Sequence, residues 1–456
     1  MTAIPKLTQK SIDRFNTPQI LRSGWYTTWG IGLLLLIISI YGVNSQRQAI
    51  KTVGKDAAPS ILTAQQLQDS FADMDASLAN ELLLKPGDNL QVIADFDKNR
   101  KKIADRLVAA AQNITYPEEE KIIQSLQLNN SAYLLKLQAA RDAHQRNDTV
   151  GALNIYQSAA TLMDRDIIPQ AEQLGRVNSQ QLEKIYAQQS YANGGISLLI
   201  AIVGLVQIGI LVIIQIFIYQ RMRRILNLPL LGATAIAVIF LGYTSSAFVG
   251  AASNLKIAKS DAFDSLYALR KMRSLSYKAN ADESRYLLDR ANSPNHEQSF
   301  NDKIAKIITA PSNMSIESII TNANRGNPTT GLTGLFADEL NNLTFSGERR
   351  LAVATLQSFN EYVKIDKQIR QLYRSGKVAE AIALCVGTKP GESNWAFDRY
   401  KNLHTELMDL NKKEFDKNIE IGNSRVENFE IIATVALGSI AILTLFGVRP
   451  RLMEYL

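Results

Sequence analysis

The sequence predicts an all-α membrane protein that crosses the bilayer four times. Four apolar runs carry no Asp, Glu, Lys or Arg, and each approaches or exceeds the ~20 residues that a spanning helix needs. They are residues 25–43, 196–219, 228–250 and 431–448. Glycine and proline are scarce, at 25 and 12 of 456 residues, which favours helix almost throughout. The order of span, long polar segment and span occurs twice, which indicates an internal duplication.

Basic residues predict the orientation of the spans. The N-terminal tail (1–24) and the loop 220–227 each carry a net charge of +3, and the C-terminal tail (449–456) carries +1. Together they account for the whole formal charge of +7. The positive-inside rule then places both termini and the loop in the cytoplasm, and segments 44–195 and 251–430 outside. Because no small-x-small cleavage site follows the first run, we expect an uncleaved anchor.

Segment 44–195 is expected to form an antiparallel four-helix bundle that is continuous with the first two spans. Turn sequences separate stretches with helical apolar periodicity. The expected helices cover about 46–84, 89–113 and 115–146, and a fourth starts at Asp148 or Thr149 and runs into the second span. Pro59 and Pro169 are expected to kink the first and last helices. Short connections between consecutive helices favour the bundle arrangement.

Segment 251–430 is expected to form a second four-helix bundle, again continuous with its flanking spans. Its first helix, the arm 251–291, leaves the third span without a Gly or Pro that would break it. An irregular stretch is predicted at 310–334 and a helix at about 346–373. The last helix is expected to run unbroken from Trp395 into the fourth span.

The arm carries a polar cluster far from the bilayer. At ~1.5 Å per residue, the helix from Gly250 to Asp282 is about 48 Å long. The cluster residues that we single out as candidates for contact with an extracytoplasmic partner are Asn280, Asp282, Glu283 and Arg285. A solvated turn of helix is the simpler explanation of the same residues.

The sequence contains no recognisable catalytic or metal-binding motif. The glycines of Gly331-Leu-Thr-Gly334 lack the following Lys-Ser/Thr of a phosphate-binding loop. Cys385 is the single cysteine, and the three histidines stand far apart, so no zinc spacing is present. Acid pairs such as Asp73 and Asp75 are interpreted as solvated helix faces. We therefore expect a non-enzymatic protein without cofactor or metal.

Transport and nucleic-acid binding are also disfavoured. The four apolar runs contain no ionisable residue, whereas ion and proton pathways normally contain one. The pI of about 9.2 comes from the Lys and Arg residues of the segments that flank the spans. No basic face remains elsewhere for binding nucleic acid.

The loop between the second and third spans is the candidate cytoplasmic contact. Its basic residues are Arg221, Arg223 and Arg224. They are explained either as an ordinary collar for anionic lipids or as a docking surface for an acidic partner. The predicted cytoplasmic segments are too short to form an output domain, so any output must be recruited.

The stretch from Asp261 to Asp289 resembles part of a known family. It contains Asp261-Ala-Phe-Asp-Ser-Leu-Tyr-Ala-Leu-Arg and, further on, Ala279-Asn-Ala-Asp-Glu-Ser-Arg-Tyr-Leu-Leu-Asp289. With the four-span layout, these residues resemble the GlnX-like four-pass bacterial membrane signalling proteins. The resemblance implies a link between an amino-acid-binding lipoprotein outside and a cytoplasmic Ser/Thr kinase. The helix pattern of 44–195 also resembles the four-helix sensor domains of chemotaxis receptors.

Three functions fit these observations. The leading hypothesis is a transmembrane sensor that relays the status of an extracytoplasmic ligand or solute-binding protein to a recruited cytoplasmic partner, such as a Ser/Thr kinase. The second is a sensor that binds a small molecule directly, between its helices or at the interface of a homodimer. The third is a structural scaffold of a membrane complex.

Overall fold

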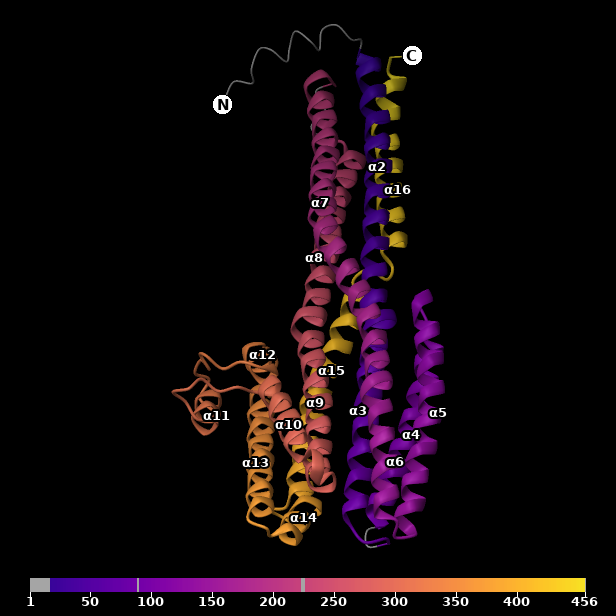
Figure 1. The fold of residues 1–456 in the computed structure, drawn as a ribbon. Helices are drawn as coiled ribbons and strands as arrows, with labels where there is room; N and C mark the ends of the chain where they lie inside the picture. The colour runs from indigo at the N-terminus through magenta and orange to yellow at the C-terminus, as the bar shows by residue number, and fades with distance from the viewer. Residues whose placement is uncertain (1–16, 88–89, 223–225, 456) are drawn as a thin grey trace. The chain divides into compact units, whose positions relative to one another are not determined.

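The computed structural model describes residues 17–87, 90–222 and 226–455, and helices make up most of them (Figure 1). The first half contains α2 (Thr17–Lys51), η1 (Thr52–Ala57), α3 (Ala58–Leu83), α4 (Leu90–Gln112), α5 (Pro117–Gln145), α6 (Thr149–Leu162), η2 (Met163–Ile167) and α7 (Ile168–Met222). The second half contains α8 (Leu228–Lys256), η3 (Ile257–Phe263), α9 (Asp264–Leu288), η4 (Arg290–Asn292), α10 (Ser293–Ile307), α11 (Ile316–Asn324), α12 (Leu335–Asn341), α13 (Glu348–Arg374), α14 (Val378–Val386), α15 (Ser393–Ser424) and α16 (Phe429–Met453). The predicted all-α class is confirmed.

The chain divides into two compact units, which are described separately. The span unit takes its described residues from 1–51, 184–255 and 418–456. The bundle unit comprises the described residues of 52–183 and 256–417. Each unit therefore combines segments from both halves of the chain.

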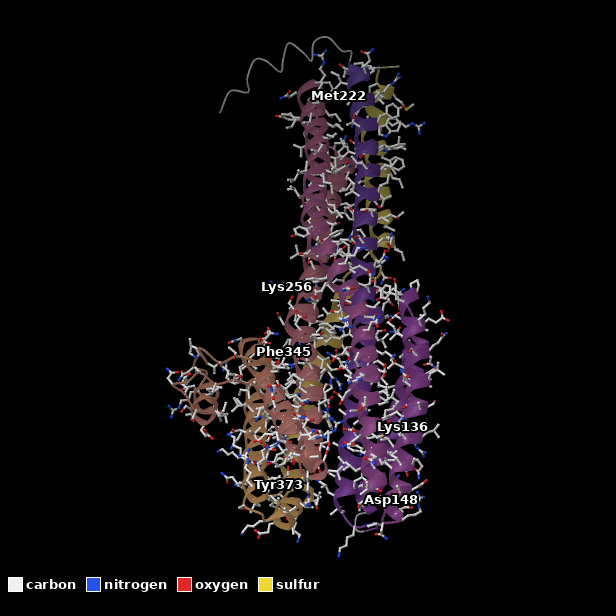
Figure 2. All side chains as sticks on the ribbon, viewed as in Figure 1. Lys136, Asp148, Met222, Lys256, Phe345 and Tyr373 are labelled. Atoms are coloured by element: carbon white, nitrogen blue, oxygen red, sulfur yellow. The ribbon has the colours of Figure 1, made fainter. Side chains whose placement is uncertain are left out.

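Four helical stretches among the described residues are long and apolar enough to cross a membrane. They are Thr17–Leu83, Thr149–Met222, Leu228–Leu288 and Ser393–Met453, and each contains one of the four predicted spans. Figure 2 shows mainly carbon in the side chains of the span unit, whereas nitrogen and oxygen are frequent in the bundle unit. The finding supports a multi-pass membrane protein, and the orientation of its termini stays a prediction.

The helix expected to run unbroken from Trp395 into the fourth span is interrupted, so that expectation is wrong. Residues 425–428 form turns between α15 and α16. The Arg47 guanidinium of α2 donates to the carbonyl oxygens of Val426 and Glu427, the latter at 2.7 Å. It also forms an ion pair with Glu430 in the first turn of α16. A cation at the end of one helix and an acid at the start of the next stabilise both termini.

The bundle unit has a continuous apolar core in its first half. α3 packs against α4, and α5 packs against α6. Phe71, Tyr133 and Leu137 lie in the buried cluster. The third helix begins at Pro117, two residues later than expected, and the Glu119 carboxylate accepts from the backbone of Thr115 and Tyr116. Asp148 caps the fourth helix, as predicted, and accepts from the backbone of Gly151.

The two predicted bundles pack together within the bundle unit, a point that the sequence left open. α9 lies along α3, and it also packs against α10, α12 and α14. Polar side chains of α3 take part in this contact. Gln65 donates to the Tyr267 carbonyl oxygen at 3.3 Å, and Ser284 donates to Asn80 at 2.6 Å.

Three of the long helices contain π-helical segments, η1, η2 and η3. Pro59 and Pro169 lie just after η1 and η2, near the first positions of α3 and α7. A proline lacks the backbone N–H that an α-helical turn would use, so the preceding turn can widen at little cost. The expected proline effects therefore take the form of π segments.

Candidate ligand-binding cleft

The four predicted contact residues of the arm are buried, so the exposed tip expected for them is absent from the structure. Asn280, Asp282, Glu283 and Arg285 retain 4%, 2%, 1% and 8% of their accessible surface. The reason is that α9 is covered by helices from both halves of the chain. Their contact with an external partner stays a prediction.

The four residues belong to two faces of α9. Glu283 belongs to a network in the second half, where it accepts from the Ser393 hydroxyl at 2.6 Å. Burial and the nearby Asp366 raise the pKa of Glu283 to about 8. Asp282 and Arg285, by contrast, line a cavity next to η2 and α10.

Arg285 connects the two halves of the bundle unit. Its Nη2 donates to the Asp75 carboxylate of α3 at 2.6 Å, and its Nε donates to the Tyr156 hydroxyl of α6 at 3.0 Å. Its Nη1 donates to Asp164 of η2 at 3.3 Å and lies 3.7 Å from Asp282. One guanidinium therefore contacts α3, α6, η2 and its own helix.

The electrostatics of this cluster are those of buried, paired charges. Asp75 is completely buried, and desolvation raises its pKa to about 6 even though Arg285 opposes the shift. Burial disfavours the charge on Arg285, but Asp75, Tyr156, Asp164 and Asp282 together raise the pKa of the guanidinium above its ordinary value. Arg285 therefore stays charged and must keep acidic partners.

A cavity of about 390 Å³ opens on one side of Arg285, lined by residues of α6, η2, η4 and α10. At its edge, Asp289 accepts from Gln157 and Asn292, each at 3.0 Å, and lies 3.3 Å from His296 Nε2. Burial favours the neutral acid, but these hydrogen bonds outweigh it and lower the pKa of Asp289. The cavity thus holds anionic and cationic groups together.

A second cavity of about 190 Å³ shares Asp164 and Arg285 with the first. Lys278 and Lys303 line it. Lys303 forms an ion pair with Asp282 and donates to Ser299 at 2.5 Å. Desolvation lowers the pKa of Lys278. We call the two cavities together the Arg285 cleft.

Asp164 is the group of the Arg285 cleft that is best placed to exchange partners. Its side chain is half exposed, whereas the other acids on Arg285, Asp75 and Asp282, are buried. It also sits in η2, and π segments inside long helices frequently mark functional sites. An anionic ligand entering the cleft would meet Arg285 at the edge that Asp164 now occupies.

Sequence reasoning missed most of this site. It interpreted Asp75 as part of a solvated face, and that interpretation is wrong because Asp75 lies in the buried stripe of α3. The signal was present: Asp75 stands four residues after Phe71 and three before Leu78, so all three share one helix face. Tyr156, Asp164 and Lys303 lie far apart in the sequence, and only the packing of α6 and α10 beside α9 brings them together.

The predicted cytoplasmic contact is described in part. Arg221 is exposed near the end of α7 and directly precedes Met222, which Figure 2 labels. Arg223 and Arg224 lie outside the described residues.

Fold and cleft together define a multi-pass helical membrane protein with a polar, charged cleft in its bundle unit. Residues 49–187 match a protein-family model described as an actinobacterial sensor domain. No curated protein and no solved structure matches the chain. The matched region contains Asp75, Tyr156 and Asp164 of the cleft, and Arg285 lies beyond it. The match supports a bacterial sensor protein.

Proposed function

We propose that this protein is a transmembrane sensor whose Arg285 cleft binds a small polar molecule with an anionic group. The observation that carries the proposal is the position of Arg285. One face of its guanidinium is held by the buried Asp75, and the other edge meets a half-exposed acid at the mouth of two cavities. The family match over residues 49–187 supports the sensor class.

The ligand acts by competing with Asp164 for Nη1 of Arg285. Asp164 precedes α7, which continues from Ile168 to Met222 and contains the predicted second span. Arg285 lies near the end of α9, which follows α8 and η3 without a break in the chain of helical residues. A change in this one contact therefore acts on two helices that lead to membrane spans. Shifts of ~1–2 Å between packed helices are typical of such transitions.

The output partner is a cytoplasmic protein, such as the Ser/Thr kinase that the family resemblance implies. It would dock on the basic loop that contains Arg221. A photo-crosslinker at Met222, used in cells, tests this step. Capture of a kinase supports it, and capture of other membrane subunits favours the scaffold alternative.

Calorimetry on the full chain in detergent tests the input step. Free amino acids, succinate and ethylammonium serve as zwitterionic, anionic and cationic probes. We expect a carboxylate-bearing probe to bind without any partner protein, and Asp164→Asn to tighten its binding several-fold because the competing charge is removed. Asp166→Asn is the matched control, since Asp166 is an exposed neighbour in η2 that lines neither cavity.

Two results would contradict the proposal. One is equal binding by the native chain and Asp164→Asn. The other is binding that requires an extracytoplasmic solute-binding protein, which would favour that partner as the direct input.

A further inference from the structure

A groove in the span unit is lined by uncharged residues from three apolar helices. It has a volume of about 420 Å³ and lies among α2, α7 and α16. Its lining includes Trp29, Gly32 and Gln207, and it contains no Asp, Glu, Lys, Arg or His among the described residues. A charged occupant would find no counter-ion there, so the groove suits a neutral molecule.

Gln207 is the unusual member of this lining. It is 1% exposed, and neither its amide nitrogen nor its amide oxygen has a hydrogen-bond partner. A carboxamide offers two donors and one acceptor, and in the hydrocarbon region no water is available to satisfy them. Gln215, two turns further along α7, is satisfied by contrast: it donates to Thr234 at 2.8 Å and to the Leu211 carbonyl oxygen at 3.2 Å.

Two other polar side chains of the groove, Thr28 and Trp29, already form hydrogen bonds within the protein. The Thr28 hydroxyl donates to the Gly24 carbonyl oxygen at 2.8 Å, and the Trp29 indole donates to the Ala441 carbonyl oxygen at 3.1 Å. Because both polar atoms of the Gln207 amide lack a partner, the amide is available for a bound molecule.

Glycines leave space beside this amide. A Cβ at Gly32 would lie 3.6 Å from Nε2 of Gln207, so Gly32 keeps the approach to the amide open. A Cβ at Gly30 or at Gly438 would meet no atom within 4 Å. Small residues at these positions provide room for a ring or a short branched group next to Gln207.

The depth of Gln207 selects among occupants. It stands near the middle of the predicted span 196–219, about 17 Å from either end at ~1.5 Å per residue. Phospholipid headgroups lie at the bilayer surface, and their acyl chains form no hydrogen bonds. A helix of a second copy, ~10 Å wide, cannot reach a side chain that is 1% exposed.

We propose that this groove binds a neutral, lipid-soluble molecule that carries a carbonyl or hydroxyl group on an apolar body. The amide nitrogen of Gln207 donates to its carbonyl oxygen, or the amide oxygen accepts from its hydroxyl. The apolar body lies against Leu33, Leu36 and Leu437 of the same groove. This site is separate from the Arg285 cleft and gives the protein a second input from within the membrane.

Fluorescence of Trp29 tests the proposal in the full chain reconstituted into phospholipid nanodiscs. The sequence has three tryptophans, so Trp25→Phe with Trp395→Phe leaves Trp29 as the reporter. Decyl-benzoquinone, which carries two carbonyl groups and quenches tryptophan, is the probe. We expect saturable quenching, with half-saturation raised at least tenfold by Gln207→Leu and unchanged by the control Gln215→Leu.

Bromodecane, a quencher without a carbonyl group, is the matched control probe. Quenching by bromodecane should be equal in the Trp29 reporter protein and in the same protein with Gln207→Leu. Equal quenching also shows that Trp29 remains accessible from lipid in the variant. Gly438→Leu, which fills the groove, should abolish the saturable quinone component. Quinone quenching that rises in proportion to the probe-to-lipid ratio, or that is unaffected by Gln207→Leu, would overturn the proposal. If quenching of Trp29 decreases as the protein concentration rises, a second copy of the chain covers the groove, and the proposal is overturned.

Discussion

Arg285 and Asp75 form a buried ion pair that comes from opposite halves of the sequence. Such pairs contribute less to stability than their geometry suggests, because both charges lose their hydration. They do fix how α3 and α9 pack, because burying Arg285 or Asp75 without its partner would cost free energy. The half-exposed Asp164 is different because water can replace its contact with Arg285. This contrast between one fixed and one exchangeable partner is the basis of the proposed switch.

A buried acid in the second half predicts a pH dependence of stability. Burial, reinforced by the neighbouring Glu348, raises the pKa of Glu339 from 4.5 to about 8. A raised pKa means that the folded state binds the proton more tightly. The stabilisation is therefore complete below pH 4.5 and is lost as the pH rises through about 8, at about 1 kcal/mol per pH unit.

We expect Glu339→Gln to reduce this loss. Thermal unfolding of the detergent-purified full chain between pH 5 and pH 9 measures it, with Asp338→Asn, an exposed neighbour, as the control. The native protein and the control should lose stability toward pH 9 more steeply than Glu339→Gln. Parallel curves for all three proteins would show that Glu339 is not protonated in the folded state.

At the scale of elements, helix positions followed from apolar periodicity and turn residues, and the start of α6 agrees with its predicted cap, Asp148. The break between α15 and α16 was not predicted, because residues 425–428 contain neither Gly nor Pro. Its cause is Arg47, which lies on α2 and reaches the carbonyl oxygens of Val426 and Glu427. A tertiary contact of this kind leaves no mark in the local sequence.

Arg47→Ala should loosen this break. The variant leaves the carbonyl oxygens of Val426 and Glu427 and the acid of Glu430 without their cation. Hydrogen bonds of charged groups contribute about 1.5–3 kcal/mol each. Hydrogen exchange of the backbone amides of residues 421–432 measures the effect, and we expect roughly tenfold faster exchange there. Arg47→Lys should give an intermediate rate, since lysine keeps the charge but not the planar fork. Unchanged exchange in both variants would contradict the assigned role.

At the scale of the whole molecule, the sequence predicted the number of spans and the helical class but not the joining of the two halves into one bundle unit. The α3–α9 contact contains the polar residues Gln65, Asn80 and Ser284. Polar residues are not part of the apolar stripes from which helix packing was predicted. The polar cluster of the arm was therefore expected to be solvated or to contact a partner. The cleft depends on the same contact. Arg285 lies on the arm and was predicted as a site residue. Asp75 and Asp164 were not predicted, because they lie on elements whose packing beside the arm was not foreseen.

The π segments η1 and η3 lie at the boundaries between the units. η1 begins at Thr52, the first residue of the bundle unit, and η3 begins at Ile257, next to the boundary at Lys256. π-helical turns inside α-helices are rare and occur frequently at functional sites. They are places where a shift in the bundle unit can be taken up by the backbone.

The central claim is that an anion in the Arg285 cleft replaces Asp164 and moves η2 relative to α9 and to α10, which packs against α9. Electron–electron distance measurements between spin labels at Asp166→Cys and Gln298→Cys test it most directly, because both positions are exposed and line neither cavity. Cys385 is replaced by Ser in the full chain. We predict that the bound carboxylate probe and the variant Asp164→Asn shift the distance by ~1–2 Å in the same direction. An unchanged distance with the probe bound would contradict the claim.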